Sequence, residues 1–457
     1  MTNLIQTVKE SLADLKSRSG AEDIIVLFSG GRDSTVLLEI VSHLKADLGI
    51  AVRAVHIDHG LTKESQDNSR QCELFARLRK IPIVVHRLAE SPSPGDSVEE
   101  WARRQRYGYI SQIIGSRTLA LTAHHLNDQV ETIIQRFVVG SGPHGLRGIM
   151  PIKRLGLGYL GRPLLTVQRK EITAFAKSRN LVWFDDPMNE ILRYERNRIR
   201  KKVVPQLESV SKGLTARLVK LSQIQAEVAE ILDSIADSKL LAEKDFRSGL
   251  SVELLKQSDL LIRPFVLKRA LLKAGVPVPR EKKIKVILEQ MLEARIDSRP
   301  LVKIGNYDLR RYDGRIYIMK SFEKKNIEKK MHEWDGLGQL KLPWGVLSAT
   351  RSRGPGISEG FIRGKGLIIK FRQGGERFQP SDRNKSTELK KLFQEWRIPP
   401  WERPLIPLIH IDDELVAVGS KAIGKSFQTE GRERETINFT WDLFIYDTEG
   451  TDWDRVA

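Results

Sequence analysis

The feature that most constrains the fold is a regular alternation of short apolar runs with helix-length segments over residues 24–139. The apolar runs are Ile24–Phe28, Ala51–Ile57, Ile81–Leu88 and Leu119–Thr122. Helical patterns fill the intervals at Ser34–Leu44, Glu64–Arg79, Glu99–Gly115 and Asn127–Val139. Strands that alternate with helices pair in parallel through right-handed crossovers. The sequence therefore predicts an α/β fold with a doubly wound parallel sheet.

Polar motifs directly follow three of these runs. They are SGGRDS at 29–34, HIDHG at 56–60 and AHHLND at 123–128. In doubly wound sheets, ligands bind beyond the carboxyl ends of the strands. The motifs are therefore expected to form one site.

The hexapeptide SGGRDS at 29–34 is suited to binding phosphate. Its two glycines allow a tight turn and a close approach of the ligand to the backbone. The helix start that follows offers unpaired N–H groups and the positive end of the helix dipole. The hydroxyls of Ser29 and Ser34 add donors, whereas Asp33 must either cap the helix or face a metal ion. A plain helix-capping turn is the alternative interpretation.

The third motif places titratable side chains at helical spacing. His124, Asp128 and Glu131 lie at i, i+4 and i+7, so one face of a helix is expected to carry them. Such a group could hold magnesium, bind a cationic substrate or remove a proton. A solvated helix start is the alternative. The helix predicted before this motif also gathers charges on one face, namely Glu99, Arg103 and Arg106.

The charge balance indicates a large anionic partner. Lys and Arg number 76 against 58 Asp and Glu, which gives a net charge of +18. This excess is spread along the chain and favours nucleic acid over a membrane. No stretch approaches the roughly 20 apolar residues of a membrane span, so a cytoplasmic location is expected. The single cysteine, Cys72, excludes an internal disulfide, a thiolate zinc site and an iron–sulfur cluster.

The pattern changes beyond residue 210. Apolar residues recur at helical spacing from Leu214 to Ile235, and a β-hairpin is expected around Asp313–Gly314. The highly charged stretch 322–336 is the best linker candidate. We predict a mononucleotide-binding domain over 1–210, a mostly helical domain over 211–321 and a small α/β, mainly β, domain over 337–457.

A second phosphate-binding signature competes with the first. Residues 419–426, GSKAIGKS, satisfy the P-loop pattern. That motif requires a preceding strand and a following helix. The sequence after residue 426 has no helical stripe, so we expect the pattern to be coincidental; a P-loop NTPase would release ADP.

The first motif resembles the PP-loop, SGGxDS, of the ATP pyrophosphatase superfamily. The fuller set of motifs is similar to the tRNA(Ile)-lysidine synthetase family, in its long form with an additional C-terminal domain. The matching segments are 58–61, 124–132, 139–146, 162–165, 186–189, 196–200, 375–380, 389–395 and 398–403. Asn127 and Val139 depart from the family pattern, where Asp and Arg are usual.

The resemblance implies ATP-dependent ligation of free L-lysine to the wobble cytidine of an isoleucine tRNA with a CAU anticodon. ATP adenylates the cytosine, pyrophosphate leaves through the PP-loop, and lysine then displaces AMP to give lysidine. The implied cofactors are ATP and Mg²⁺, with Asp33 as the metal ligand. The implied ATP-binding residues are Ser29, Gly30, Gly31, Arg32, Asp33, Ser34 and Asp58.

Further roles follow from the same resemblance. Candidates for lysine binding, proton handling and charge stabilisation are His124, Asp128, Glu131, Arg103, Arg106 and Arg196. Candidates for tRNA binding in the basic C-terminal region are Arg377, Lys390, Lys391 and Arg403. The aromatic residues among them are expected to be core, because Leu389, Leu392, Phe393 and Trp396 have helical spacing.

Other functions remain open at this point. A tRNA thiolase of the same superfamily would normally need more cysteines, and a non-catalytic tRNA-binding protein with a relic nucleotide fold would not need an intact SGGRDS. The oligomeric state is also open, with a homodimer as one option.

Overall fold

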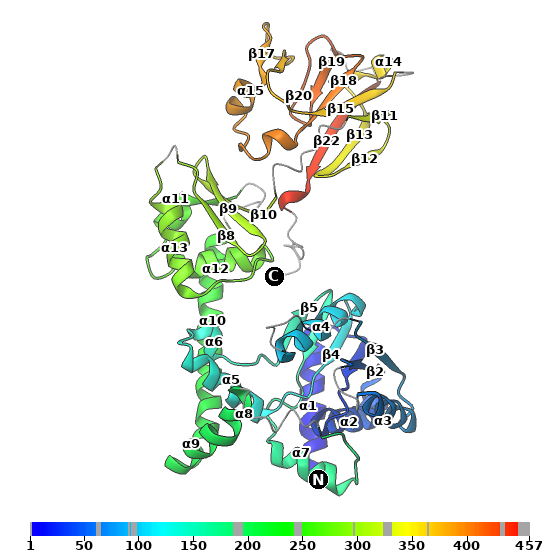
Figure 1. Cartoon of the computed structure of the whole chain (residues 1–457), viewed down its shortest axis with the longest axis vertical. Helices are drawn as coiled ribbons and strands as arrows, with labels where there is room; N and C mark the ends of the chain where they lie inside the picture. Colours follow the sequence, from blue (N-terminus) through cyan, green and yellow to red (C-terminus); the bar gives the residue numbers. More distant parts are fainter. Residues whose placement is uncertain are drawn as a thin grey trace. The chain divides into compact units, whose positions relative to one another are not determined.

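The computed structural model describes residues 2–60, 65–89, 92, 98–185, 195–241, 249–295, 298–322, 331–362, 365–429 and 435–446. The chain divides into two compact units, Met1–Ile231 and Leu232–Ala457. Figure 1 colours the chain along its sequence, from blue at the N-terminus to red near the C-terminus.

The first unit is built on a six-stranded sheet in the order β3-β2-β1-β4-β6-β5. The strands are β1 (Asp23–Leu27), β2 (Ala51–Asp58), β3 (Ile83–Arg87), β4 (Thr118–Leu121), β5 (Ile152–Leu155) and β6 (Gly158–Gly161). All neighbours are parallel except β5 and β6, which form an antiparallel pair. The predicted doubly wound parallel sheet is therefore confirmed, and the antiparallel edge strand is an addition.

The helices of the first unit are α1 (Thr2–Ser19), α2 (Arg32–Leu48), α3 (Ser65–Leu78), α4 (Val98–Ile113), α5 (Leu126–Val138), α6 (Pro143–Leu146), α7 (Arg169–Ser178), α8 (Glu195–Arg198), the π-helical turn η2 (Ile199–Val203) and α9 (Val204–Val210). Helix α10 (Leu214–Leu240) begins in the first unit and ends in the second, where Ala236 and Leu240 enter the core. Alternate residues of β1 enter different cores: Ile24 and Val26 pack with α1, α2 and α7, whereas Ile25 and Leu27 pack with α4. Burial on both faces explains why β1 is apolar throughout.

The second unit begins with three helices against a four-stranded antiparallel sheet, β7-β10-β9-β8. Its elements are β7 (Leu250–Ser251), α11 (Val252–Gln257), α12 (Arg263–Lys273), α13 (Glu281–Leu292), β8 (Leu301–Ile304), β9 (Tyr307–Tyr312) and β10 (Arg315–Lys320). The predicted hairpin is confirmed, since Asp313 and Gly314 both have positive φ, at 47° and 72°, between β9 and β10. Two consecutive positive φ values suit the tight twist of such a turn.

The rest of the second unit is mainly antiparallel sheet, in the orders β11-β15-β18-β19-β20 and β12-β13-β22-β14-β21, with a short β16–β17 pair. Its elements are β11 (His332–Trp334), β12 (Gln339–Leu342), β13 (Gly345–Arg353), β14 (Gly356–Ser358), α14 (Glu359–Ile362), β15 (Leu367–Phe371), β16 (Arg377–Phe378), β17 (Thr387–Glu388), α15 (Leu389–Glu395), the 3₁₀ turn η5 (Arg403–Leu405), β18 (Pro407–Ile411), β19 (Glu414–Val418), β20 (Ala422–Ile423), β21 (Gln428–Thr429), β22 (Glu435–Leu443) and the 3₁₀ turn η6 (Phe444–Tyr446).

An aromatic cluster lies where η5 and η6 meet β10 within the second unit. The ring of Trp401 packs edge-on against Tyr317 at a centroid distance of 5.3 Å. Its indole N–H donates to the hydroxyl of Tyr446 at 2.9 Å, and that hydroxyl donates to Glu402. Met319, Leu405 and Ile445 complete this buried cluster.

The predicted linker, residues 322–336, is wrong at its C-terminal end. Residues 323–330 lie outside the described part of the chain, whereas His332–Trp334 is strand β11, paired with β15. Charge dominates the composition of this stretch, but the buried ring of Trp334 anchors its end in the core. The three-domain division of the sequence stays a prediction.

No helix among the described residues is long and apolar enough to cross a membrane. The helical stripe predicted after residue 210 forms α10. Much of it is open to solvent in the described structure, with exposed fractions of 36–60% at Leu221, Ile224, Val228, Ile231 and Ile235.

Candidate functional site

The loop that follows β1 has the geometry of a phosphate-binding turn. Gly30 has φ +82°, a value that L side chains rarely adopt. Helix α2 starts at Arg32, and its N-cap residue, Gly31, offers no side chain to its first N–H groups. The hydroxyls of Ser29 and Ser34 lie 2.9 Å apart at the same turn. The helix start therefore presents donors and a positive dipole end to an anion.

Helix α3 packs tightly against this loop. A Cβ on Gly30 would lie 2.1 Å from Oδ1 of Asn68 and 2.9 Å from the sulfur of Cys72. The amide of Asn68 donates to the carbonyl of Ser29 at 3.1 Å. On the other side, the N–H of Phe184 donates to the carbonyl of Gly30 at 2.9 Å. Glycine is required at position 30 both for its backbone conformation and for space.

Asp33 carries the negative charge of the loop. One of its carboxylate oxygens accepts from Nε of Arg32 at 3.0 Å, and the other lies 3.5 Å from Nε2 of His125. Burial alone would raise the pKa of Asp33, but the hydrogen bonds and charges of His125 and Arg32 outweigh it and lower the pKa to about 2. The carboxylate is therefore ionised at any physiological pH.

A metal ion bound together with nucleotide phosphates fits this loop. Magnesium typically takes one or two carboxylates, with phosphate and water oxygens filling the other positions. Asp33 supplies one carboxylate, and its side chain is 30% exposed. No cluster of three His, Cys, Asp or Glu side chains suited to a metal occurs in the described part of the chain, so nucleotide oxygens would have to complete the coordination.

Helix α5 begins at Leu126, one residue before the predicted start at Asn127 and two residues after His124. Its N-cap is His125, whose Nδ1 accepts from the N–H of Asp128 at 3.4 Å. The carboxylate of Asp128 in turn accepts from the N–H of His125 at 2.9 Å. The expectation that His124 shares a helical face with Asp128 and Glu131 is thus wrong, because His124 precedes the cap. His125 was not among the predicted site residues, although it links α5 to Asp33.

Asp128 and Glu131 instead face two arginines from α8 and η2. Arg196 donates to Asp128 at 2.5 Å and to Glu131 at 2.7 Å. Arg200 donates from Nε to the other oxygen of Glu131 at 2.6 Å. Asp128 and Glu131 are 8% and 1% exposed, so the carboxylates of this four-residue ion-pair network are buried, whereas the side chains of Arg196 and Arg200 are partly exposed. The sequence identified Arg196 as a candidate, whereas the role of Arg200 emerges only from the fold.

His124 lies among cations. Its Nδ1 is 2.8 Å from the hydroxyl of Thr122. Burial, followed by the positive charges of Arg162, Arg196, Arg103 and Arg106, holds the pKa of His124 well below its usual range. The imidazole is therefore neutral at physiological pH and able to accept a hydrogen bond.

Of the two arginines predicted on α4, Arg103 is exposed and Arg106 is partly buried. A terminal nitrogen of Arg106 lies 3.5 Å from Nε2 of His59. Burial, and then the charge of Arg106, lower the pKa of His59 to about 4. The side chain of Glu99, predicted on the same face, lies outside the described structure.

The carboxylate of Asp58, at the end of β2, forms hydrogen bonds with neighbouring residues of the fold. It accepts from the N–H of Gly60 at 2.9 Å and from Nε of Arg87 at 3.0 Å. Burial opposes ionisation of Asp58, but these two partners outweigh it and lower its pKa. The structure thus gives Asp58 a role in holding the turn after β2.

Comparison with known proteins adds to this geometry. Family models match residues 2–207 as a PP-loop domain, 250–317 as a TilS substrate binding domain and 367–441 as a TilS substrate C-terminal domain. The tRNA(Ile)-lysidine synthase of Coxiella burnetii is 34% identical over 430 residues, covering 93% of this chain and 95% of that relative. The chain belongs to the tRNA(Ile)-lysidine synthase family. The Methylococcus capsulatus member is 32% identical over 91% of this chain and 95% of its own length.

One residue that departs from the family motifs makes a structural contact. Asn127, where the family pattern usually has Asp, accepts from the N–H of Arg169 at 2.9 Å and so ties α5 to the start of α7. The predicted segment 186–189 lies outside the described residues.

Predicted tRNA-binding residues of the family's C-terminal domain divide into two groups. Arg377, Lys390 and Lys391 are exposed, the two lysines on α15. Arg403 is 9% exposed; its guanidinium donates to the carbonyl of Ile398 at 2.9 Å and to the hydroxyl of Tyr312 at 3.3 Å. Of the aromatic residues on and after α15, Phe393 is fully buried and Trp401 is 3% exposed, as expected, whereas Trp396 is only partly buried against the same core.

The competing P-loop signature at 419–426 does not have the required geometry. A strand, β19, precedes it, but β20 lies within it and β21 follows at Gln428–Thr429. Within the described residues no helix starts there to receive a phosphate. The prediction that this pattern is coincidental is confirmed.

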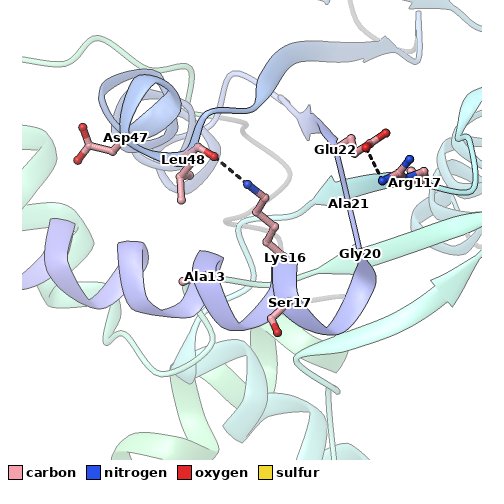
Figure 2. Close-up of a pocket in the computed structure, with 9 residues that line it drawn as sticks. All are labelled: Ala13, Lys16, Ser17, Gly20, Ala21, Glu22, Asp47, Leu48 and Arg117. Atoms are coloured by element: carbon pink, nitrogen blue, oxygen red, sulfur yellow. Dashed lines mark hydrogen bonds and ion pairs between the residues drawn. The ribbon is translucent and has the colours of Figure 1, made fainter.

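A shallow pocket of about 680 Å³ opens elsewhere in the first unit (Figure 2). It is lined by residues at the amino ends of β1 and β4, including Glu22 and Arg117, which form an ion pair. Lys16, also in the lining, donates to the carbonyl of Leu48 at 2.8 Å. The phosphate-binding loop lies at the carboxyl end of β1, so this pocket is at the opposite edge of the sheet from the candidate site.

Proposed function

We propose that this chain ligates free L-lysine to the wobble cytidine of the CAU anticodon of an isoleucine tRNA, using ATP. The proposal rests on the proximity of an intact phosphate-binding loop to the buried carboxylates of Asp128 and Glu131. His125 connects the two, because it contacts Asp33 in the loop and caps the helix that carries both carboxylates. The loop is suited to binding a nucleoside triphosphate, and the two carboxylates are suited to binding an amine.

The loop at 29–34 binds the phosphates of ATP. Backbone N–H groups at the start of α2 and the hydroxyls of Ser29 and Ser34 hold the β and γ phosphates. Asp33, with Arg32 beside it, would hold a magnesium ion, which would supply neutralising charge to the phosphates. Oxygen O2 of the cytosine attacks the α-phosphorus, and pyrophosphate leaves.

Asp128 and Glu131 bind the side-chain ammonium of lysine. In the described structure Arg196 and Arg200 donate to these carboxylates, so a lysine ammonium would take over part of a hydrogen-bonding arrangement that already suits a cation. The amine then attacks C2 of the cytosine and expels AMP, with loss of a proton. Arg103, Arg106 and Arg196 balance the charge of the leaving phosphate.

The amine must be neutral to attack, whereas its ordinary pKa is near 10.4. A positive electrostatic field lowers the pKa of an ammonium group. Arg103, Arg106 and Arg196 supply such a field around His124, so they favour loss of the proton from an amine bound there.

Arg377, Lys390 and Lys391 contact the tRNA backbone, whereas Arg403 acts through the fold by joining residue 398 to β9. Asp58 supports the ATP site through the turn after β2. A homodimer and a cytoplasmic location stay predictions.

The test is product analysis with ATP, lysine and tRNA, followed by mass spectrometry of nucleosides. We expect AMP that depends on both substrates, and a cytidine that carries lysine. AMP without lysine transfer would indicate another nucleophile, and ADP would indicate a different kind of ATPase. No AMP from folded protein with the isoleucine tRNA would leave a non-catalytic tRNA-binding protein as the function.

The acidic pair can be tested in the same assay. The variant Asp128→Asn should lose lysine transfer, because it removes one carboxylate from the amine site. Asp47→Asn is the matched control, since Asp47 is an exposed carboxylate paired only with Lys9 among the described residues. Full lysine-dependent turnover by the Asp128 variant would remove Asp128 from the proposed site.

A further inference from the structure

The side chain of Asn68, on α3, lies against the phosphate-binding loop. Its Nδ2 donates to the carbonyl of Ser29 at 3.1 Å. Its Oδ1 fills the space beside Gly30, since a Cβ on that glycine would come within 2.1 Å of it. Asn68 belongs to none of the motifs that carry the family resemblance, and it is only partly buried. Its contact with the loop is therefore a feature of this chain that the motifs do not explain.

The hydrogen bond from Asn68 fixes the orientation of the peptide between Ser29 and Gly30. In a trans peptide the C=O and N–H bonds point in opposite directions. Because the carbonyl of Ser29 is held toward α3, the N–H of Gly30 is turned toward the face of the loop that is away from α3. Backbone N–H groups turned to one face of such a turn form an anion-binding concavity. With the peptide reversed, the carbonyl oxygen would lie on that face and repel the oxygens of a phosphate.

The next peptide of the loop is held by other elements. The carbonyl of Gly30 accepts from the N–H of Phe184 at 2.9 Å and from the hydroxyl of Thr35 at 3.3 Å. Both peptides that flank the Cα of Gly30 are thus restrained, the first of them by Asn68. Glycine has more backbone freedom than any other residue, so an unrestrained loop would lose more conformational entropy when it binds a ligand.

The thiol of Cys72 determines which end of the Asn68 amide faces the loop. Cys72 lies about one helical turn after Asn68, and its Sγ donates to Oδ1 of Asn68 at 3.7 Å. Cys72 is 1% exposed, and burial, followed by the charge of Glu73, raises the pKa of its thiol to about 12. The sulfur is therefore protonated and acts as a weak donor. A flipped amide would place Oδ1 against the carbonyl of Ser29 and Nδ2 against the S–H group, so both hydrogen bonds would be lost.

We propose that Asn68 is a positioning residue: oriented by the thiol of Cys72, it holds the loop in the conformation that receives the β and γ phosphates of ATP. Asn68 acts through the backbone of Ser29 and Gly30 and not through contact with the nucleotide. This inference rests on the proposed function, in which the loop binds ATP, and gives α3 a part in it. A residue that served only to pack α3 would change the stability of the protein without changing the KM for one substrate alone.

The experiment measures AMP formation by the full chain with ATP, lysine and tRNA, and its inhibition by pyrophosphate and by added AMP. In Asn68→Ala the KM for ATP should rise by about 2- to 10-fold, the range of one hydrogen bond. The inhibition constant of pyrophosphate should rise by the same factor, because pyrophosphate occupies the loop. The KM for lysine should stay at its wild-type value. So should the inhibition constant of AMP, which lacks the β and γ phosphates.

Asn68→Asp tests the same hydrogen bond with a side chain of nearly the same shape. It replaces the donor by a carboxylate oxygen that faces the carbonyl of Ser29, and it adds a negative charge beside the loop. The KM for ATP should therefore rise further than in Asn68→Ala. Asn438→Ala is the matched control, because Nδ2 of Asn438 donates to the carbonyl of Pro355 at 3.2 Å in the second unit. This control should leave the KM for ATP unchanged.

Two variants at Cys72 separate the hydrogen bond of the thiol from its volume. Cys72→Ser keeps a donor at this position, so its KM for ATP should stay near the wild-type value. Cys72→Ala removes the donor and leaves the amide of Asn68 free to flip. Its KM for ATP should rise by about 2-fold, the lower end of the range for one hydrogen bond.

An unchanged KM for ATP in both Asn68 variants, with unfolding in urea showing that they are folded, would overturn the proposal. An equal rise in the KM for ATP and the KM for lysine would also overturn it, because a general loosening of the first unit would then explain both. Identical KM values for ATP in the two Cys72 variants would exclude the thiol from the arrangement. Failure of the proposed function has a separate signature, because wild-type protein itself would then form no AMP from ATP, lysine and tRNA.

Discussion

Nε2 of His125 lies 3.5 Å from a carboxylate oxygen of Asp33, which joins the cap of α5 to the phosphate-binding loop. The two residues follow β4 and β1, which are neighbouring parallel strands. Parallel pairing brings their carboxyl ends to one edge of the sheet. A single imidazole therefore stands between the groups proposed to bind ATP and those proposed to bind lysine.

Gly30→Ala should abolish ATP binding and lower stability. The new Cβ would need φ +82° and would lie 2.1 Å from Oδ1 of Asn68. Strain of this kind costs about 1–3 kcal/mol, measurable by urea unfolding. Gly31→Ala is the control for stability, since its nearest neighbour would be 3.6 Å away. Equal stability of the two variants would contradict the packing described for α3.

Asp33→Asn should reduce AMP formation by about 10²-fold, the scale of a lost electrostatic contact in a reaction centre. The pKa of Asp33 is lowered from 3.8 to about 2, so the carboxylate is ionised across the working pH range. Its contribution to stability is present above pH 3.8 and is lost as the pH falls through about 2. The ratio of wild-type to variant rates should thus be constant between about pH 5 and 9. A ratio that follows a titration in this range would refute the assignment.

Glu131 and Arg200 should show strong energetic coupling. Removing one partner of a buried ion pair leaves the other charge unpaired, which lowers the free energy of unfolding by about 3–5 kcal/mol. We expect Glu131→Gln to approach this loss. In the double variant with Arg200→Met, the total cost should be smaller than the sum by about 1–3 kcal/mol. Additive free energies of unfolding in urea would show that the pair at 2.6 Å is not coupled.

The double variant Lys390→Ala/Lys391→Ala should weaken tRNA binding and flatten its salt dependence. Each phosphate contact contributes about 0.7–0.9 to the slope of log K against log salt. Both lysines are exposed, so the slope should fall by about 1–2. Lys9→Ala changes the charge of a different surface and should leave the slope near the wild-type value. An unaltered slope in the double variant would exclude α15 from the tRNA interface.

The strands and helices of the first unit could be predicted because their apolar periodicity is local. The helical spacing of Leu389 and Phe393 likewise identified a core helix, and both residues are fully buried. In contrast, His125 rather than His124 is the N-cap of α5 because its side chain accepts a hydrogen bond from the N–H of Asp128. The periodicity of the sequence does not specify this bond. A local pattern cannot distinguish these neighbours.

Long-range pairing was also beyond the sequence. Arg200 meets Glu131 across 69 positions, and Arg403 reaches Tyr312 across 91. The sequence suggested Arg403 as a tRNA-binding residue, together with Arg377, Lys390 and Lys391. Carbonyl and hydroxyl acceptors bury Arg403 instead, and only the folded chain brings those acceptors together.

The contact between Tyr317 and the Trp401–Tyr446 pair affects how the protein is made. Ribosomes synthesise the chain from its N-terminus, so β10 emerges well before residues 401 and 446. Until those residues are made, an aromatic face of the nascent sheet stays uncovered. Slow translation between codons 317 and 446 therefore prolongs the exposure of this aromatic surface.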